Sequence, residues 1–285
     1  MTVTGEAIFD TSRVGERVES PVILITADNT RGFAEATNDD NPELLAGTLA
    51  PPLYALVPVL KTMVEAKNNV TSAFAFHGEH DLTVHEPLLA GMAVRVVATV
   101  VGVRQRSAGV ATVVHVETRS TAGALLNEQY FTSFVSGGRV ADPGGADPPA
   151  RPAQAAAAGP SQELTLALDP DQTRRFAAAA DDWDAYTLDE AVARSMGFPT
   201  IIVHGTCTMA FAGRAIVKEA CDDDVRRLER FAARLSRPLL LVPGQVLTTR
   251  LWPTGYRDGR RLYGFEAFDH EGTTMLKNGL AEVRA

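Results

Sequence analysis

Apolar residues recur at two different periods along the chain, and the change between the periods divides it into two similar parts. In residues 51–68 (PPLYALVPVLKTMVEAKN) and 205–222 (GTCTMAFAGRAIVKEACD) they recur at helical spacing, which predicts one long helix in each part. Pro51 and Pro52 suit the first turn of the earlier helix. A buried stripe is predicted on the later helix, made of Met209, Ala212, Ile216 and Ala220.

After each long helix the chain alternates between apolar and polar residues, a pattern that predicts β-strands. In the first part these strands are expected at residues 94–105, 110–121 and 126–137, with a hairpin turn at RSAG between the first two. The second part ends in a similar series over residues 245–285, where YRDGRR and DHEGT are the predicted turns. One long helix against an antiparallel meander predicts an α+β fold in which strands wrap the helix, which is the hotdog architecture. We therefore predict a double hotdog whose two sheets join into one.

A segment dense in Pro, Gly and Ala lies between the two parts, from Ser136 to Glu163. It predicts an exposed linker of low order. The predicted domains are residues 1–136, a linker at 137–161, and residues 162–285.

The two parts also share landmarks in the same order, which indicates a duplication. Phe33 is followed six residues later by Asp39, and Phe176 is followed six residues later by Asp182. Further along, HEPLLAGMAVRV in the first part matches SRPLLLVPGQVLTT in the second, each with Pro-Leu-Leu, a Gly and then an alternating strand.

Composition narrows the classes of function. The formal net charge is −8 with 45% hydrophobic residues, so a sizeable core is expected and nucleic-acid binding is disfavoured. Cys207 and Cys221 are fourteen residues apart and are not expected to form a disulfide, which favours a reducing, cytoplasmic compartment. Neither CxxC nor HxxxH is present, so no metal site is predicted. The chain lacks both a signal-peptide pattern and the roughly 18 apolar residues of a membrane span, and no membrane partner is expected.

Residues 181–205, DDWDAYTLDEAVARSMGFPTIIVHG, carry a family likeness. They resemble the signature of the MaoC-like, or (R)-specific hydratase 2, family of double-hotdog proteins. That signature reads Gly-Asp-x-Asn-Pro-(Leu/Ile)-His-x-Asp, then a short helix, Gly-Phe and His-Gly. Asp182 stands at the first signature Asp and Asp189 at the later one. The first part is similar to the family's N-terminal hotdog through NDDNPE, LAPPLYAL and FHGEHDLTVHEPLLAGM, so the likeness covers nearly the whole chain apart from the linker.

The resemblance implies a hydro-lyase. Family members add water to a trans-2-enoyl thioester or remove it from an (R)-3-hydroxyacyl thioester, carried by coenzyme A or by acyl carrier protein. It implies no cofactor, and a homodimer is a family expectation.

Two residues are predicted to carry the chemistry. Asp182 is the candidate general base, because burial would raise its pKa towards a useful range. The N–H of Gly205, at the start of the long second helix, is the candidate donor to the thioester oxyanion. The plainer alternatives are a turn or cap carboxylate for Asp182 and an ordinary helix entry for Gly205.

The site departs from the family at the signature histidine, where this chain has Thr187. Asp184 and Tyr186 also replace signature residues, as does an Ala for the Pro. A threonine cannot titrate near neutral pH, so half of the acid–base pair is missing. The candidates to replace it are Tyr186, Asp184 and His204, although a histidine at position 204 is more often structural.

The first part is predicted to hold substrate rather than to catalyse. Leu44 stands at its signature His position, and Pro51 and Pro52 have no N–H to offer an oxyanion. Three histidines lie in FHGEHDLTVH. Alternation along a strand places His77 and His85 on one face and His80 on the other, and we predict surface histidines there rather than ligands.

Substrate contacts are predicted along an apolar slot at the seam between the two parts. The candidates are Trp183 and Phe198 for the acyl group, and Arg234, Arg237 and Arg250 near the mouth for the phosphates of the carrier. For the arginines, an ordinary solvated surface is an equal alternative.

Three functions stay open at this stage. The first is a hydratase or dehydratase with a changed second proton carrier. The second is an enzyme redirected to cyclisation or isomerisation of a polyketide-like intermediate, which the lost histidine and the aromatic pair Trp183 and Tyr186 favour. The third is a non-catalytic partner subunit, which the absence of a full acid–base pair favours.

Overall fold

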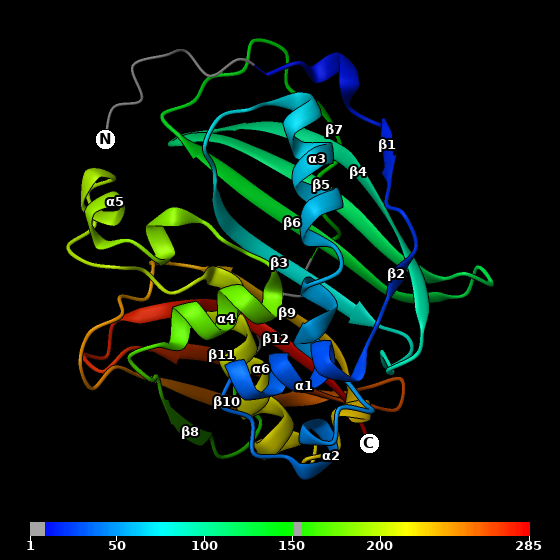
Figure 1. The fold of residues 1–285 in the computed structure, drawn as a ribbon, viewed down its shortest axis with the longest axis vertical. Coiled ribbons are helices and arrows are strands. Elements are labelled where there is room, and N and C mark those ends of the chain that lie inside the picture. The colour runs from blue at the N-terminus through cyan, green and yellow to red at the C-terminus, as the bar shows by residue number, and fades with distance from the viewer. Residues whose placement is uncertain (1–8, 151–155) are drawn as a thin grey trace.

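The computed structural model describes residues 9–150 and 156–285, and in these ranges one antiparallel sheet curves over a layer of helices (Figure 1). The main strands run in the order β1-β4-β5-β6-β3-β9-β12-β11-β10-β8, with β2 and β7 added against β4. The strands of the first half are β1 (Arg17–Glu19), β2 (Ile23–Leu24), β3 (Phe76–Val84), β4 (Ala93–Arg106), β5 (Gly109–Ser120), β6 (Leu125–Ser136) and β7 (Gly144–Gly145). Those of the second are β8 (Gln162–Ala167), β9 (Leu228–Leu235), β10 (Val246–Arg257), β11 (Arg260–Phe268) and β12 (Thr274–Arg284).

The strand order reads the same from the middle outwards in both directions, as a duplication requires. The first half contributes β3, β6, β5, β4 and β1 outwards from the centre, and the second contributes β9, β12, β11, β10 and β8. The two halves are therefore equivalent units related by the contact between β3 and β9. The predicted hairpins and meanders are confirmed.

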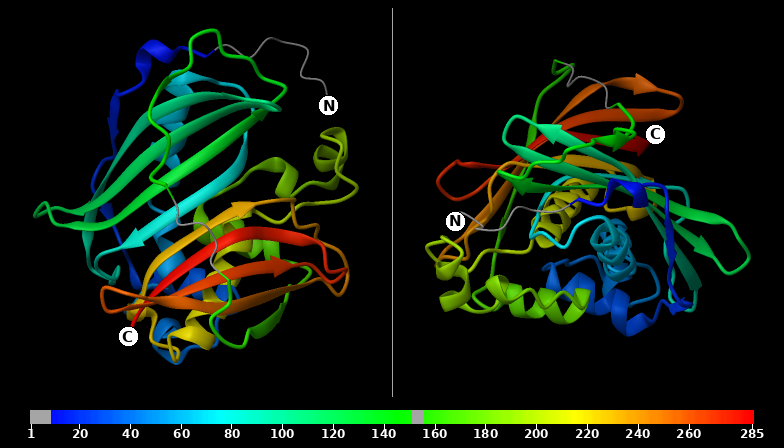
Figure 2. Two further views of the ribbon diagram at one scale, coloured as in Figure 1. Left: turned by 180° about the vertical axis from the view of Figure 1, so that it is seen from behind. Right: turned by 90° about the horizontal axis from the view of Figure 1, so that it is seen from above.

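Helices of both halves lie on the concave side of the sheet (Figure 2). The α-helices are α1 (Ala27–Ala36), α2 (Pro42–Leu45), α3 (Leu60–Val70), α4 (Gln172–Ala180), α5 (Glu190–Ser195) and α6 (Gly205–Ala220). Short 3-10 turns are η1 (Thr11–Arg13), η2 (Pro52–Leu56), η3 (Ala185–Thr187) and η4 (Val225–Arg227).

Of the two predicted long helices, one is continuous in the structure and the other is divided. The later one is α6, and the predicted stripe is buried, but Phe211 and Val217 on other faces are buried as well. Burial on every side follows from a helix wrapped by its own sheet and covered by the other half. The earlier one is divided into η2 and α3, with the break at Pro58, because a proline has no N–H for a helical hydrogen bond.

The halves join at the edge between β3 and β9, where Glu79–Thr83 pair antiparallel with Arg230–Arg234. Arg230 lies at this seam and donates to both carboxylate oxygens of Asp81, at 2.9 and 2.8 Å, and to Glu282 at 3.1 Å. Asp81 and Glu282 are 4% and 5% exposed. A bidentate guanidinium between two buried carboxylates fixes the register of the seam.

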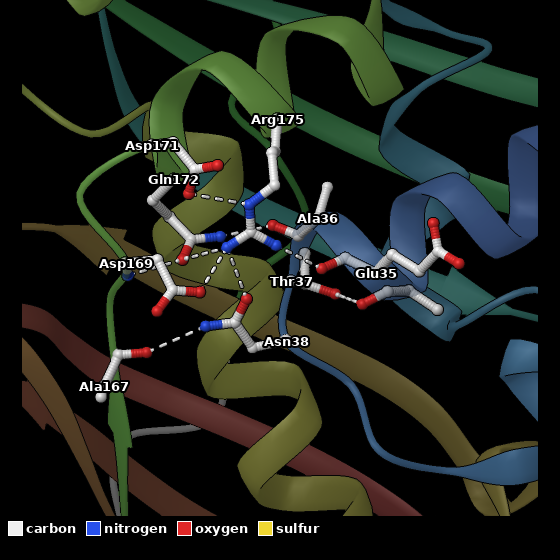
Figure 3. A network of polar contacts seen from close by, with 10 residues as sticks. Glu35, Ala36, Thr37, Asn38, Ala167, Asp169, Asp171, Gln172 and Arg175 are labelled. Carbon is white, nitrogen blue, oxygen red and sulfur yellow. Dashed lines mark hydrogen bonds and ion pairs between the residues drawn. The ribbon is translucent and has the colours of Figure 1, made fainter.

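On the helical side, the halves meet through α1 and α4. The rings of Phe33 and Phe176 lie 5.7 Å apart, so the two residues matched by the repeat contact each other. Around them, Arg175 donates to the Glu35 carbonyl at 2.8 Å and to Asn38 Oδ1 at 2.9 Å, both at the end of α1 (Figure 3). These bonds cross between the halves and hold α1 against α4.

The segment predicted as a linker is partly paired. Gly144–Gly145 form β7 against β4, and Asp147 accepts from Arg104 and Arg106. Backbone pairing is possible here because Gly145 lies within contact distance of the Val101 carbonyl, where a side chain would not fit. Residues 151–155 of this segment lie outside the described ranges, and the predicted domain boundaries stay a prediction.

Three further features concern the cysteines, the length of the helices and the metal-ligating side chains. Cys207 and Cys221 are both buried and free of disulfides. Of the described helices, none has the length and apolar character that crossing a bilayer requires. Within residues 9–150 and 156–285, the side chains of His, Cys, Asp and Glu do not gather into a metal-binding group of three.

Candidate active site

The segment with the family signature runs from the end of α4 to the start of α6 in a series of short turns. Helix α4 ends at Asp181, which has a left-handed backbone, φ 51°, and Asp182 then donates its N–H back to the Ala177 carbonyl. After η3, Asp189 begins α5, and its carboxylate accepts from the N–H groups of Ala191 and Val192. This second signature aspartate is therefore a helix cap.

His204 ties the signature segment to the start of α6. Its Nε2 lies 3.0 Å from the Asp182 carbonyl oxygen and 2.9 Å from Thr187 Oγ1. A carbonyl oxygen only accepts hydrogen bonds, so Nε2 of His204 carries the hydrogen. The Thr187 hydroxyl donates its own hydrogen bond to the Asp184 carbonyl oxygen at 2.6 Å and accepts the one from His204. Burial lowers the pKa of His204, so the ring is neutral.

This arrangement favours a structural role for His204 and Thr187. The Thr187 hydroxyl and Nε2 of His204 hold the segment, whereas Nδ1 of His204 is buried without a hydrogen-bond partner among the described residues. The predicted alternatives Tyr186 and Asp184 are also committed, because the Tyr186 hydroxyl donates to Asp184 Oδ2 at 2.6 Å. Burial raises the pKa of Tyr186, so the phenol keeps its proton.

Asp182 has the electrostatics of a general base. Burial, with a smaller contribution from the charge of Asp184, raises its pKa to about 6. Among the ion pairs of the described residues, none involves Asp182. The repeat-equivalent Asp39 is also buried with a raised pKa, but Arg214 of α6 lies 3.9 Å away and counteracts that shift. Of the two equivalent carboxylates, Asp182 is thus the one poised near neutral pH.

Gly205 begins α6 in close contact with both halves. A Cβ at this position would lie 2.7 Å from Leu235 Cδ2 of β9 and 3.8 Å from His77 Nδ1 of β3. The side chain of His204 does not cap the helix, so it leaves the first-turn N–H groups to other acceptors. The glycine therefore brings the positive end of a 16-residue helix against the seam.

The prediction for the histidines of β3 was wrong for two of the three. The pairing of β3 with β6 shifts register between His77 and Glu79, which is a β-bulge, and alternation restarts after it. His77 and His80 consequently lie on the same, inward face, with ring centroids 5.3 Å apart. His80 is 1% exposed, and the Nε2 of His77 is also shielded from solvent. Only His85, which follows the strand, is exposed as predicted.

Aromatic rings from both halves meet beside the signature segment. Phe74 packs edge-on against Tyr186, with ring centroids 5.6 Å apart, and Phe76 packs in the same way against Phe198 at 6.0 Å. Tyr186 and Phe198 were predicted site residues, whereas Phe74 and Phe76 were not. The signal for the latter pair was the run FAF at the start of β3.

The remaining predicted contacts are not brought to this place. Trp183 is 59% exposed and donates to Asp181 Oδ1 at 2.9 Å. Arg234 alternates with the inward Ala233 and Leu235, so it lies on the outer face of the sheet, 3.8 Å from Glu79. Arg237 is exposed in the loop after β9, and Arg250 is paired with Glu163.

Two lysines that the sequence reasoning missed do face the segment. Lys61 of α3 pairs with Asp181 at 2.5 Å. Lys67, one and a half turns further along, is half-buried; burial lowers its pKa, and the charge of Asp184 partly offsets this shift. The basic groups beside the signature segment, Lys61 and Lys67, therefore come from the first half.

The equivalent place in the first half is a hollow of about 290 Å³ at the other end of the seam. It lies beside Pro51 and Pro52 and is also lined by His85, Asn127 and Arg226. Because the helix start there is Pro-Pro, it has fewer N–H donors than the start of α6.

Comparison with known proteins agrees with this architecture. A MaoC-like dehydratase from Phytophthora capsici superimposes with a TM-score of 0.84 over 96% of this chain and 97% of that one, at 21% identity. 3-Hydroxyacyl-thioester dehydratase Y of Mycobacterium tuberculosis is 26% identical over 241 residues, covering 82% of this chain and 81% of that protein. Peroxisomal multifunctional enzyme type 2 of Mus musculus is 26% identical over 215 residues, which are 74% of this chain but only 28% of that enzyme.

The fold and the comparisons define the class first: the chain is a double-hotdog protein of the α+β class, as predicted. More particularly, residues 152–271 match the model of the MaoC like domain, so this part of the chain is similar to that family. The predicted resemblance is confirmed.

Proposed function

We propose that this protein is a hydro-lyase that adds water to a trans-2-enoyl thioester and catalyses the reverse dehydration of a (R)-3-hydroxyacyl thioester. The relatives named above include a 3-hydroxyacyl-thioester dehydratase, and the matched family domain lies over the signature segment. The acyl thioester is the proposed partner, carried by coenzyme A or by acyl carrier protein, and cytoplasm is the proposed location.

In the hydration direction, Asp182 starts as the carboxylate. It takes one proton from water while the water oxygen forms a bond to C3, and the π electrons of the double bond move towards C2 and the thioester oxygen. The N–H of Gly205 and the positive end of α6 stabilise the negative charge on that oxygen. Transfer of the proton from Asp182 to C2 completes the addition and regenerates the carboxylate.

One observation carries the proposal: Asp182, whose half-buried carboxyl has a pKa of about 6, is linked through its backbone carbonyl to the start of α6 by a single bridging residue, His204. A catalytic base works best when its pKa lies near the working pH, and an oxyanion donor must be fixed in place. The signature segment provides both within one short stretch of chain.

The test compares the two equivalent carboxylates. Crotonyl-CoA hydration, followed by the loss of enoyl absorbance, is measured for the wild type, Asp182→Asn and Asp39→Asn. We expect Asp182→Asn to lose on the order of 10²–10⁴ in kcat, while Asp39→Asn keeps most of it, because Asp39 faces Arg214. Wild-type protein that is inactive on enoyl thioesters of both carriers would contradict the proposal, as would equal losses in the two variants.

The aromatic rings favour a second candidate, an enzyme redirected to cyclisation or isomerisation of a larger thioester. Phe74, Phe76, Tyr186 and Phe198 gather beside the segment, and Thr187 replaces the signature histidine. Product analysis by mass spectrometry separates this candidate from the first, because hydration adds 18 mass units and isomerisation adds none. The non-catalytic partner subunit is supported only by the missing signature histidine, because the Thr187 hydroxyl at that position donates to a backbone carbonyl.

A further inference from the structure

In the signature segment, the hydroxyl of Thr187 and Nε2 of His204 are committed to other bonds, and Nδ1 of His204 is buried without a hydrogen-bond partner among the described residues. Thr187 donates to a backbone carbonyl and accepts from His204, and Nε2 of His204 is spent on that bond and on Asp182. A water molecule that loses a proton to Asp182 needs another polar contact to fix its position. Besides Nδ1 of His204, such a contact can come from β3, which borders the start of α6.

His77 of β3 is an imidazole at the right place. Its Nδ1 lies 3.8 Å from where a Cβ of Gly205 would be, so the ring borders the start of α6. The ring is held by stacking on Phe131, with centroids 3.8 Å apart and planes 25° apart. Its Nε2 is buried and has no hydrogen-bond partner among the described residues.

Two further polar atoms near this ring share that property. Ser133 stands directly opposite His77 in the register of β3 with β6, so both side chains project from the same face of the sheet. The Oγ of Ser133 and the Oγ1 of Thr206, the residue after Gly205, are buried and lack partners among the described residues. Nδ1 of His204, the residue before Gly205, is a fourth such atom. Buried polar atoms are nearly always hydrogen-bonded, so four such atoms on His77, its strand partner and the first residues of α6 indicate a small polar occupant such as water.

We infer that His77, contributed by the first half, takes the place of the missing signature histidine and holds the water that Asp182 deprotonates. The inference rests on the proposed function. In hydration, one O–H of the water donates to a ring nitrogen of His77, and the other proton passes to Asp182 as the oxygen bonds to C3. His77 keeps its own proton count throughout, and Asp182 returns its proton to C2.

The surroundings of His77 suit a neutral acceptor. Burial, and to a lesser degree the neighbouring His80, lower its pKa well below the ordinary value of a histidine. The ring therefore retains one unprotonated nitrogen at neutral pH, which a hydrogen bond from water requires.

The experiment uses the full chain and crotonyl-CoA with His77→Gln, and His85→Gln as the matched control from the exposed end of the same strand. We expect His77→Gln to lower kcat on the order of 10–10²-fold with KM nearly unchanged, because the water contact acts on the chemical step. His85→Gln should stay within about twofold of the wild type. The decisive variant is His77→Gln/Thr187→His, which should recover about tenfold or more of the lost kcat, since the signature position again carries an imidazole.

The outcomes distinguish the role of His77 from the proposed hydro-lyase activity. If the wild type is active, Asp182→Asn is not, and His77→Gln turns over like the wild type, this inference is overturned and the proposed function stands. Loss of activity in His77→Gln without recovery in the double variant assigns a merely structural role to His77 and also overturns it. A wild type inactive on enoyl thioesters overturns the proposed function itself.

A measurement on the wild type covers the case in which His77→Gln does not fold. Histidine ¹⁵N NMR follows the ring that shows contacts to both Phe131 and Gly205, which distinguishes His77 from His80, while butyryl-CoA, which lacks the double bond, is added. A change in the ¹⁵N shifts of that ring is expected, because the thioester enters beside it. An unchanged resonance at saturating butyryl-CoA refutes the inference.

Discussion

The Nε2 of His204 lies 3.0 Å from the carbonyl oxygen of Asp182. This bond joins the residue that begins the signature segment to the residue that precedes the N–H groups of α6. The position of the Asp182 backbone is therefore set by the same side chain that leads into Gly205. The base and the oxyanion donor of the proposed reaction are therefore held by one residue.

The rate of hydration should depend on pH through Asp182. The carboxylate is the active form in this direction, and burial raises its pKa to about 6, so kcat/KM should rise with pH and level off above about 7. Initial rates on crotonyl-CoA between pH 4.5 and 8.5 give the midpoint. Asp39→Asn serves as the control and should keep the same midpoint. A midpoint near 4, the ordinary range of an aspartate, would show that Asp182 is not the titrating base.

Asp182→Asn should unfold less readily than the wild type at pH 8. The folded-state pKa of about 6 exceeds the ordinary 3.8, so the folded protein binds this proton more tightly than the unfolded chain. The carboxylate consequently costs stability as pH rises from about 4 through 6, by about 1–3 kcal/mol at pH 8, and costs almost nothing below pH 4. Urea unfolding at pH 8 and pH 4 measures the difference, and a variant that is less stable than the wild type at pH 8 would refute this reading.

Gly205→Ala should impair catalysis more than it impairs folding. The new methyl group would lie 2.7 Å from Leu235 Cδ2, a side-chain end that can move, at a cost of about 1–3 kcal/mol. A shifted helix start misplaces the oxyanion donor, and we expect kcat to fall on the order of 10–10²-fold. Gly213→Ala is the control. Gly213 lies about two turns further along α6, and a methyl group there would contact Leu53 instead of the start of the helix. Equal losses of activity in both variants would mean that packing alone requires Gly205.

Arg230→Met should destabilise the whole protein. It removes the guanidinium that lies between the buried carboxylates of Asp81 and Glu282 at the seam. Losing one member of a buried ionic group costs about 3–5 kcal/mol, and urea denaturation measures that loss. Arg250→Met, which removes only the exposed pair with Glu163, should cost less than about 1 kcal/mol. Comparable values for the two variants would show that the seam does not depend on this cluster.

Much of the architecture could be predicted from the sequence because it rests on local periodicity. The meanders, the hairpin at RSAG and helix α6 follow from apolar spacing, and the match of Phe33 with Phe176 predicted a duplication whose two members contact each other. The first long helix was not predicted correctly because the apolar pattern continues through Pro58, while the backbone cannot. Periodicity reports which face is buried and does not report a missing N–H.

The site was only partly predictable. Asp182 lies near Tyr186, and Tyr186 and Phe198 each reach the aromatic rings before β3, because all three belong to one segment with a recognisable signature. His77 was assigned to the surface because strict alternation was assumed, and the bulge after it reverses the face of every later residue in β3. Gly78 was the available signal, since a glycine inside a strand often marks a bulge. The outward direction of Arg234 depended on the register with the other half, which a single sequence does not contain.

The continuous edge between β3 and β9 has a consequence for how such a chain can evolve. Each half ends in a strand that has no other neighbour on that side, so neither can be lost, exchanged or expressed alone without exposing an open sheet edge. Mutations that abolish chemistry in the first half are tolerated as long as its edge and its inward side chains persist. The two copies have thus been free to specialise in what they do, but not to separate.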